Sequence, residues 1–400
     1  MLRVLGYYAT RDLIPLYGVY ALLFSDHGLS AGQISTLFVV WSVTSFVFEV
    51  PSGAWADTVD RRRLLVLSAA VLAAGFATWV VFPSYAGFAA GFVLWGISGA
   101  LMSGTFEALL YDELAARSAT SSYARLVGWS ASAAMAAALV GIVLAAPLFA
   151  AGGYELVGWT SVAVAVVHGV LAWSLPRAPV AERSGDSVRR YRSMLRGGLV
   201  EATRHRTVRR VLLLSSAMIG LTAYDEYFPV IARDHGTATS HVPLLVGLVT
   251  LGQLVGTALA GRTARMAPAT LGAVVAVSAV LLSLGSLAGH VVGFAAIAVG
   301  YGLINNAMIV GEARLQDVIE GPARATVTSV SGVTVEVAAL TLYATVGIGS
   351  VWTSVSVLVA LLGVPTLAVA AAVRRWMPPA AQEADGQRSE EDSVSTMRST

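Results

Sequence analysis

The chain of 400 residues contains no cysteine and no lysine, and few charged side chains of either sign. Without cysteine it has neither a disulfide framework nor a thiolate metal site. Without lysine it cannot contain the phosphate-binding loop G-x-x-x-x-G-K-[ST], so we do not expect it to use ATP directly. Charged residues make up 12% of the chain, against roughly 25% in soluble proteins. The composition therefore points away from a soluble protein.

What the chain has instead is apolar length, since 56% of its residues are hydrophobic. An apolar run of about 20 residues spans a bilayer as a helix. We identify twelve such runs: 4–24, 33–56, 63–82, 86–110, 124–149, 155–175, 210–232, 241–261, 269–288, 291–314, 325–348 and 351–375. They are too long for barrel strands and do not alternate with a period of two. We therefore expect an all-α polytopic membrane protein.

Three short segments recur in the same order in the second half of the chain. The pairs are 11–15 with 225–229, 26–28 with 234–236, and 107–112 with 312–317. Such duplication is typical of transporters whose substrate site lies between the repeats. We therefore expect twelve transmembrane helices in two pseudo-symmetric six-helix bundles, 1–176 and 210–376.

Two segments are too polar to span a membrane. Residues 177–209 form an arginine-rich cytoplasmic linker, interpreted as a solvated connector or as a short amphipathic helix on the anionic inner leaflet. Residues 377–400 are rich in Glu, Asp, Ser and Gln, a composition that cannot bury a core. We expect this tail to be disordered and cytoplasmic.

The basic residues are sorted by side. Arginines follow the second span at Arg61–Arg63, ten lie between Arg177 and Arg210, and the opposite loops hold only Arg233. Arginine-rich loops remain in the cytoplasm. We expect a multi-pass protein of the cytoplasmic membrane with both termini inside.

Segment 53–63, GAWADTVDRRR, places a carboxylate and three arginines at the cytoplasmic end of two helices. Asp57 can cap the positive N-terminus of a neighbouring helix and pair with arginine, so it can control opening at this rim. The alternative is a basic cluster that only fixes topology. In the second half Gly261 replaces the aspartate, so we expect the two halves to differ here.

This segment resembles the signature loop of the major facilitator superfamily, G-x-x-x-D-[RK]-x-G-[RK]-[RK]. The matching residues are Gly53, Asp57, Arg61 and Arg62, and the departures are Thr58 and Asp60. Segments 48–52 and 107–112, the latter ending in Asp112, also resemble a twelve-helix drug/proton-antiporter-like subgroup. The resemblance covers residues 1–376. It implies a cytoplasmic gate motif with Asp57 near Thr326 and Ser329, and a cavity lined by the first and seventh helices.

Ionisable residues inside spans are costly in lipid and usually functional. The repeat-related positions carry Arg11–Asp12 in one half and Asp225–Glu226 in the other. Asp225 lies nine residues before Asp234, roughly 14 Å along a helix and near the membrane midplane. Residues about 100° apart on a helix should not both face one cavity. We interpret these carboxylates as a proton and substrate site. The alternative is a structural pair with Arg11.

Other polar and aromatic residues are weaker candidates. Glu107 and Glu336 are proposed for the same cavity, although Glu107 and its mate Glu312 are equally suited to a rim ion pair with Arg125 or Arg324. We interpret His168 as a packing residue. The aromatic residues expected around the acids are Tyr8, Tyr17, Tyr224, Tyr227 and Phe228.

Two features common among proton antiporters of the superfamily are missing. No arginine occurs in 86–110, the fourth span, and the fifth span has only Ala146–Pro147 in place of a Gly-Pro pair. Antiport therefore does not follow from these motifs. Arg11 is a candidate to supply the missing positive charge.

We expect a secondary active transporter that moves a small organic solute by alternating access. Proton-coupled efflux of a hydrophobic or cationic compound, a drug or metabolite, is favoured by acids among aromatic residues. The alternatives are proton-coupled or facilitated nutrient uptake and a non-transporting membrane sensor. No residue pattern indicates an enzyme, a metal or a cofactor, and the energy source would be the proton gradient. We expect a monomer whose partners are the solute and the bilayer, and no nucleic acid.

Overall fold

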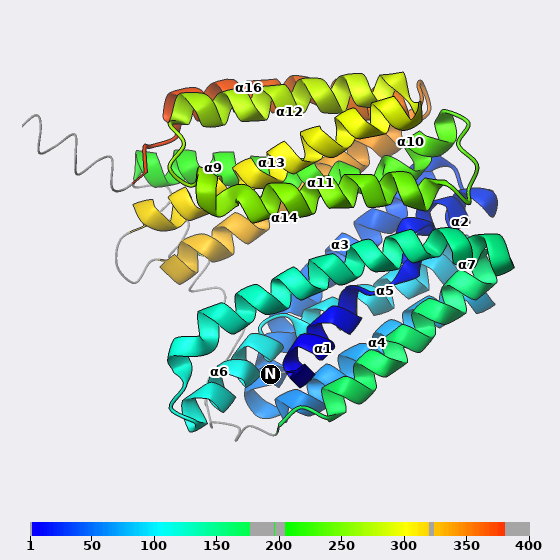
Figure 1. Cartoon of the computed structure of the whole chain (residues 1–400), viewed down its shortest axis with the longest axis vertical. Coiled ribbons are helices and arrows are strands. Elements are labelled where there is room, and N and C mark those ends of the chain that lie inside the picture. Colours follow the sequence, from blue (N-terminus) through cyan, green and yellow to red (C-terminus); the bar gives the residue numbers. More distant parts are fainter. Residues whose placement is uncertain (1, 177–195, 197–204, 320–323, 381–400) are drawn as a thin grey trace, which may run out of the picture.

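The computed structural model describes residues 2–176, 196, 205–319 and 324–380, and every regular element in these ranges is helical. Most of the expected linker and nearly all of the expected tail lie outside these residues. Nine described helical stretches are long and apolar enough to cross a membrane. One of them contains two spans, and two further spans are interrupted helices, which gives the twelve spans of the fold. Figure 1 shows them as two helical bundles.

The first bundle contains the helices that precede the linker. They are α1 (Leu2–Asp12), η1 (Pro15–Gly18), α2 (Tyr20–Asp26), α3 (Ala31–Thr58), α4 (Arg61–Val81), α5 (Tyr85–Met102), α6 (Thr105–Ala116), η2 (Thr120–Ser122) and α7 (Tyr123–Trp173). The fifth and sixth spans both lie in α7, which turns at Gly152 and Gly153 with non-helical backbone angles. Gly153 has φ 59°, a left-handed conformation that glycine adopts without steric cost.

The second bundle repeats this order. It contains α9 (Arg206–Leu221), η3 (Thr222–Tyr227), α10 (Phe228–Asp234), α11 (Val242–Thr263), α12 (Pro268–Ala288), α13 (His290–Val318), α14 (Arg324–Gly349), α15 (Val355–Leu361) and α16 (Gly363–Trp376). α3, α4, α11, α12 and α13 begin and end within a few residues of the corresponding apolar runs. The expected fourth span, 86–110, is instead divided, because α5 ends at Met102, Gly104 has φ 70° and α6 begins at Thr105.

The first and seventh spans are not continuous helices, which corrects the expectation for 4–24 and 210–232. In the first, α1 stops at Asp12 and the chain passes through η1 before α2 starts. In the seventh, α9 stops at Leu221 and η3 separates it from α10. Pro15 opens η1 and Pro229 lies in the first turn of α10. Proline favours such helix starts because it lacks the N–H that an interior position needs.

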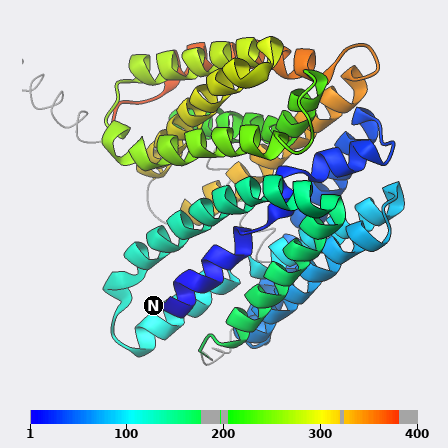
Figure 2. The same cartoon turned by 45° about the vertical axis from the view of Figure 1, so that its right-hand side comes forward.

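In the described part of the chain the two bundles converge toward one end. We call it the arginine-poor end, where α2 and α10 lie, and the opposite one the arginine-rich end, where the N-terminus and α6 lie. In Figures 1 and 2 the bundles converge at the first and diverge toward the second.

Small and aromatic residues of α3 and α14 form much of this closure. A Cβ atom on Gly32 would lie 3.2 Å from the carbonyl oxygen of Gly347, so the two backbones are close. Deeper along the same helices the rings of Phe38 and Tyr343 are 5.4 Å apart. Small residues allow such close helix packing in membranes. The structure is therefore closed at the arginine-poor end.

Candidate functional site

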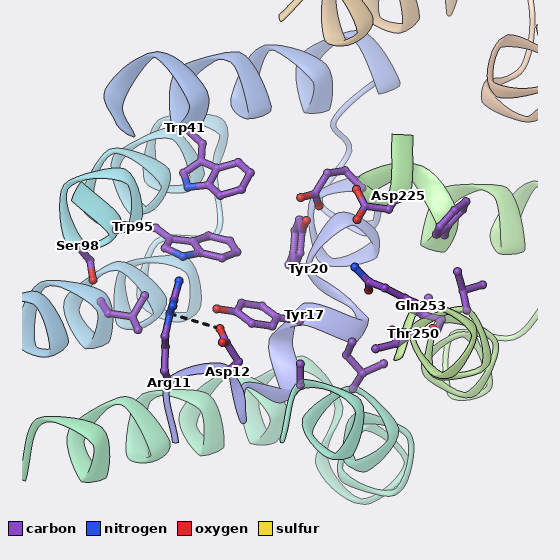
Figure 3. A pocket seen from close by; sticks show the side chains of 18 of the residues that line it. Arg11, Asp12, Tyr17, Tyr20, Trp41, Trp95, Ser98, Asp225, Thr250 and Gln253 are labelled. Carbon is purple, nitrogen blue, oxygen red and sulfur yellow. Dashed lines mark hydrogen bonds and ion pairs between the residues drawn. The ribbon is translucent and has the colours of Figure 1, made fainter. Parts of the chain in front are cut away.

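A cavity of about 360 Å³ lies between the two bundles, below the closed end. Its charged lining consists of Arg11, Asp12, Asp225 and Glu226, contributed by the interrupted spans of both repeats. Figure 3 shows the first three of these side chains around the cavity. One arginine against three carboxylates gives a formal charge of −2. The two charged pairs at corresponding positions of the repeat therefore line the same cavity.

Arg11 and Asp12 lie at the last residues of α1, where the helix stops. Arg11 Nε is 3.7 Å from Asp12 Oδ1, and the two side chains are 38% and 24% exposed. A cation at a helix C-terminus is also favoured by the helix dipole. This pair neutralises itself, so the carboxylates of the second bundle have no ion-pair partner among the described residues.

Asp225 and Glu226 both line the cavity, and the expectation that they could not share it is wrong. The 100° argument assumed a continuous α-helix, whereas these residues lie in η3, where the chain passes from one helix to the next. Their partners differ. Asp225 accepts a hydrogen bond from the Tyr301 hydroxyl at 2.6 Å. The Glu226 carboxylate has no hydrogen bond or ion pair with any described residue.

An aromatic wall lies across the cavity from Asp225. It consists of Tyr17, Trp41 and Trp95, and Tyr20 lies between this wall and Asp225 (Figure 3). Tyr17 stacks on Trp95 with ring centroids 5.2 Å apart and planes inclined by 9°, and Trp41 lies 5.1 Å from Trp95. Of these residues only Tyr17 is predicted from the sequence, because a tryptophan inside an apolar run carries no sign of which side it faces.

Hydrogen-bonding groups complete the wall of the second bundle. Thr250 and Gln253 of α11 line the cavity, and Gln253 donates to the Asn305 side chain at 3.2 Å. Asn305 in turn donates to the carbonyl of Tyr301 at 2.8 Å. This network holds Tyr301, and through it Asp225, in place.

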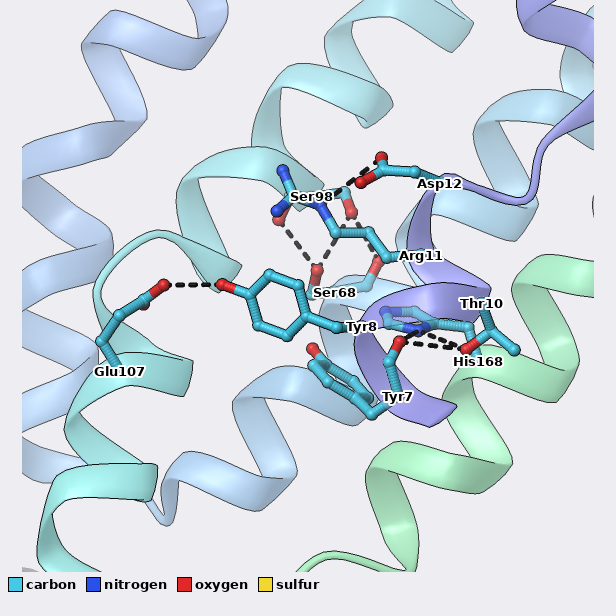
Figure 4. Close-up of polar contacts among 9 residues, drawn as sticks. All are labelled: Tyr7, Tyr8, Thr10, Arg11, Asp12, Ser68, Ser98, Glu107 and His168. Atoms are coloured by element: carbon cyan, nitrogen blue, oxygen red, sulfur yellow. Dashed lines mark hydrogen bonds and ion pairs between the residues drawn. The ribbon is translucent and has the colours of Figure 1, made fainter. Parts of the chain in front are cut away.

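Tyr8 and Glu107 contact each other outside this lining. The Tyr8 hydroxyl donates to Glu107 at 2.7 Å, and the Arg11 guanidinium lies 6.0 Å from the Tyr8 ring (Figure 4). His168 stacks on Tyr7 at 4.3 Å, and its Nδ1 lies 3.0 Å from the Tyr7 carbonyl oxygen. His168 also borders the cavity. Its stacking and hydrogen-bond partner, Tyr7, belongs to α1, so His168 packs the sixth span against the first.

Three further candidates lie in the protein interior or at the contact between bundles. Tyr224 is buried against Tyr301, with ring centroids 5.9 Å apart. Tyr227 forms a 2.7 Å hydrogen bond with Ser35 of the other bundle. Glu336 of α14 accepts a hydrogen bond from Ser42 of α3. Tyr227 and Glu336 therefore take part in closure.

The gate motif is described in part. Arg61 is buried and pairs with Asp112, and Arg62 lies 4.6 Å from the Trp173 ring. Asp60, which replaces the glycine of the pattern, accepts from the backbone N–H of Arg63 at 3.1 Å and so caps α4. The side chains of Asp57 and Thr58 lie outside the described residues, so the role of Asp57 stays a prediction.

The second bundle is built differently at this end. Arg314 is buried and donates to the backbone carbonyls of Ala264, Met266 and Pro378. It therefore joins the end of α11 to the segment after α16. The position of Arg314 near a helix end gives no sign in the sequence that its side chain is buried.

Residues at the arginine-poor end were also missed. Arg233 binds Asp26 of the other bundle through two nitrogens, at 2.6 and 3.2 Å. From the sequence alone, Arg233 is only an indicator of topology, and Asp26 is only part of a repeated segment. Their separation of 207 positions gives no local signal of pairing.

Comparisons with known proteins agree with this architecture. The family model described as Major Facilitator Superfamily matches residues 4–315. A crystal structure of the nucleoside transporter NupG (D323A mutant) superposes with a TM-score of 0.73 at 11% identity, covering 94% of this chain and 99% of that one. No curated protein matches the sequence.

Two further solved structures have the same fold. A D-xylose-proton symporter gives a TM-score of 0.69 at 14% identity, with 94% and 96% coverage of this chain and that one. A bacterial homologue of the human lysosomal transporter Spinster, in an inward-facing and unoccupied conformation, gives 0.67 at 16%, with 94% and 91% coverage. With the family match over more than half of its length, the chain belongs to the major facilitator superfamily, a family of transporters with two six-helix bundles.

Proposed function

We propose that this protein exports a hydrophobic organic cation across the cytoplasmic membrane in exchange for protons, by alternating access. The observation that carries the proposal is the composition of the cavity: unneutralised carboxylates on one wall and stacked aromatic rings on the other. Its volume lies within the range of about 300–1,000 Å³ typical of small-molecule sites.

The electrostatics favour a cation over an anion. The lining has a formal charge of −2 because Arg11 is engaged with Asp12. Glu226 is the carboxylate best placed to bind the solute, since Asp225 is already held by Tyr301. Aromatic rings of this wall would attract a cation through their quadrupoles, an effect of about 0.5–2 kcal/mol for an open ring face.

Proton coupling follows from competition for the same group. A carboxylate in the cavity can bind a proton or the positive charge of the solute, but one ligand weakens the binding of the other. When the cavity faces the compartment with more protons, protonation would release the cation. When it faces the other compartment, the free carboxylate would bind a new one. Such an exchange uses the proton gradient to expel cations.

The arginine distribution supports the proposed direction. The arginine-rich end should face the cytoplasm. The closed end would then be external, and the structure would correspond to the state that accepts solute from inside.

Transport into proteoliposomes tests the proposal. Purified protein is reconstituted, a pH difference is imposed, and uptake of ethidium, a planar organic cation, is measured against a neutral aromatic compound of similar size. We expect ethidium to accumulate on the acidic side and the neutral compound to equilibrate without accumulation. Equal behaviour of both compounds, or accumulation that ignores the direction of the gradient, would exclude cation–proton exchange.

Uptake of a polar nutrient is the second candidate. It is favoured by Thr250 and Gln253, whose side chains can hydrogen-bond a hydroxylated solute. A nucleoside transporter and a xylose symporter also share the fold. Counterflow with labelled nucleosides and pentoses in the same vesicles separates the two. Saturable nucleoside or pentose exchange without ethidium transport would favour uptake, and no exchange of any solute would favour a sensor.

A further inference from the structure

An ion pair joins the two bundles at the arginine-poor end, between the short helices α2 and α10. The Arg233 guanidinium donates to both oxygens of Asp26, at 2.6 and 3.2 Å. The Tyr154 hydroxyl also donates to Asp26, at 2.6 Å, and Arg233 donates to Thr239 at 2.7 Å. Asp26 therefore has partners from both bundles, and Arg233 is oriented by its own loop.

The repeat provides an internal comparison. Asp234 occupies the position in the second half that Asp26 occupies in the first. Yet Asp234 accepts from the hydroxyl of Ser356, at 3.0 Å, within its own bundle. One of two equivalent carboxylates thus connects the bundles, while the other stabilises the start of α15.

The pair is charged over a wide pH range. Partial burial acts to raise the pKa of Asp26, but hydrogen bonds from Arg233 and Tyr154 outweigh it, so the pKa is lowered. The contribution of the pair is present above the ordinary aspartate pKa of about 4 and is lost only as the pH falls through the lowered value. His27 lies beside Asp26 and adds positive charge when protonated, which favours the carboxylate further. Mild acid therefore leaves the pair intact.

We propose that Asp26, Arg233 and Tyr154 form a lock that holds the arginine-poor end closed and biases the protein toward the state open at the arginine-rich end. For the arginine-poor end to open, α2 and α10 must separate, and the lock joins these two helices. In the opposite state both charges would face solvent, where water replaces the lost contacts at modest cost.

The expected effect is moderate. Each side chain of the ion pair is about one third exposed, at 33% and 32%, so solvent weakens their attraction. Two-point geometry and the tyrosine hydrogen bond raise it above that of an isolated surface pair. We expect removal of either charge to shift the ratio of the two states about three- to tenfold, which corresponds to about 0.7–1.4 kcal/mol.

External labelling of a cysteine in the cavity measures this ratio. The chain has no native cysteine, so Val246→Cys on the cavity wall provides a single thiol. An impermeant maleimide outside intact cells reaches it only when the arginine-poor end opens. The assay assumes that the arginine-poor end faces outward. Ala238→Cys in the exposed loop tests this orientation independently, because a thiol there should be labelled rapidly from outside.

Asp26→Asn and Arg233→Gln should each raise the labelling rate of Val246→Cys about three- to tenfold. The double exchange, Asp26→Arg with Arg233→Asp, should reverse part of the increase, since it restores opposite charges but not the Tyr154 bond. Asp234→Asn, the matched control from the repeat, should leave the rate unchanged. Thermal stability in detergent monitors folding.

Unchanged labelling in Asp26→Asn and Arg233→Gln would refute the lock. Equal increases in Asp26→Asn and Asp234→Asn would also refute it, by showing a general loosening of this end. The measurement needs no substrate. A failure of ethidium transport would therefore leave the labelling result standing, and a failure of the lock would leave the transport proposal intact.

Discussion

The packing of Gly347 against the first bundle yields a quantitative prediction. A Cβ atom at this position would lie 2.9 Å from the Cβ of Ser35 and 3.7 Å from the Gly32 carbonyl oxygen. Carbon atoms pack optimally at about 3.5–4.0 Å. Neither Cβ can rotate away, because each is fixed directly to a helix backbone. Gly347→Ala therefore forces α3 and α14 apart at the closed end.

The cost follows from the size of this displacement. Inserting a carbon into a packed contact costs typically about 1–3 kcal/mol. The clash exists only while the arginine-poor end is closed, since α3 and α14 separate there in the opposite state. The whole cost should therefore act on the conformational equilibrium, and we expect a shift of about 5- to 150-fold toward the state open at the arginine-poor end.

The assay is the external labelling rate of Val246→Cys with and without Gly347→Ala. The matched control is Gly293→Ala, whose added Cβ would lie 2.6 Å from the Gly285 carbonyl oxygen inside the second bundle. That clash persists in both states, so it should lower thermal stability without raising the labelling rate. An unchanged labelling rate in Gly347→Ala, or the same increase in both variants, would refute the separation of α3 and α14 at this contact during opening.

Three further outcomes are expected. Single cysteines in 28–32 should react with an impermeant reagent from outside, and those in 184–200 only from inside. Asp57→Asn should slow transport strongly while substrate binding, measured by Trp fluorescence quenching, is retained, because the residue would act on the exchange of states. Glu226→Gln should abolish both ethidium binding and gradient-driven transport, whereas Asp225→Asn should retain ethidium exchange between equilibrated compartments, because its carboxylate is already occupied by a tyrosine. Transport at the normal rate in both carboxylate variants would move the proton site elsewhere.

Sequence predicted the helices well because apolar length is a direct physical requirement of the bilayer. The repeat also placed Arg11, Asp12, Asp225 and Glu226 at corresponding positions, and the structure brings them to one cavity. Continuity of the helices was harder to judge. A proline indicates where a helix is weakened, but the length of η3 depends on the packing around it.

Partners across bundles could not be predicted at all. The contacts of Ser35 with Tyr227 and of Ser42 with Glu336 join helices far apart in sequence, and serine is common on helix surfaces. The cavity tryptophans pose the same problem, since an aromatic ring suits lipid, packing and ligand alike. Only the relative placement of the bundles decides among these roles.

The ion pair between Asp26 and Arg233 also bears on how the duplicated halves have diverged. By the repeat alignment, the first half carries Ser25 where the second carries Arg233. Two copies of the first half, assembled like the present chain, would place Asp26 opposite a serine and would lack this contact. The ancestral symmetry is therefore broken at the closing surface, and the two halves are complementary parts that cannot replace each other.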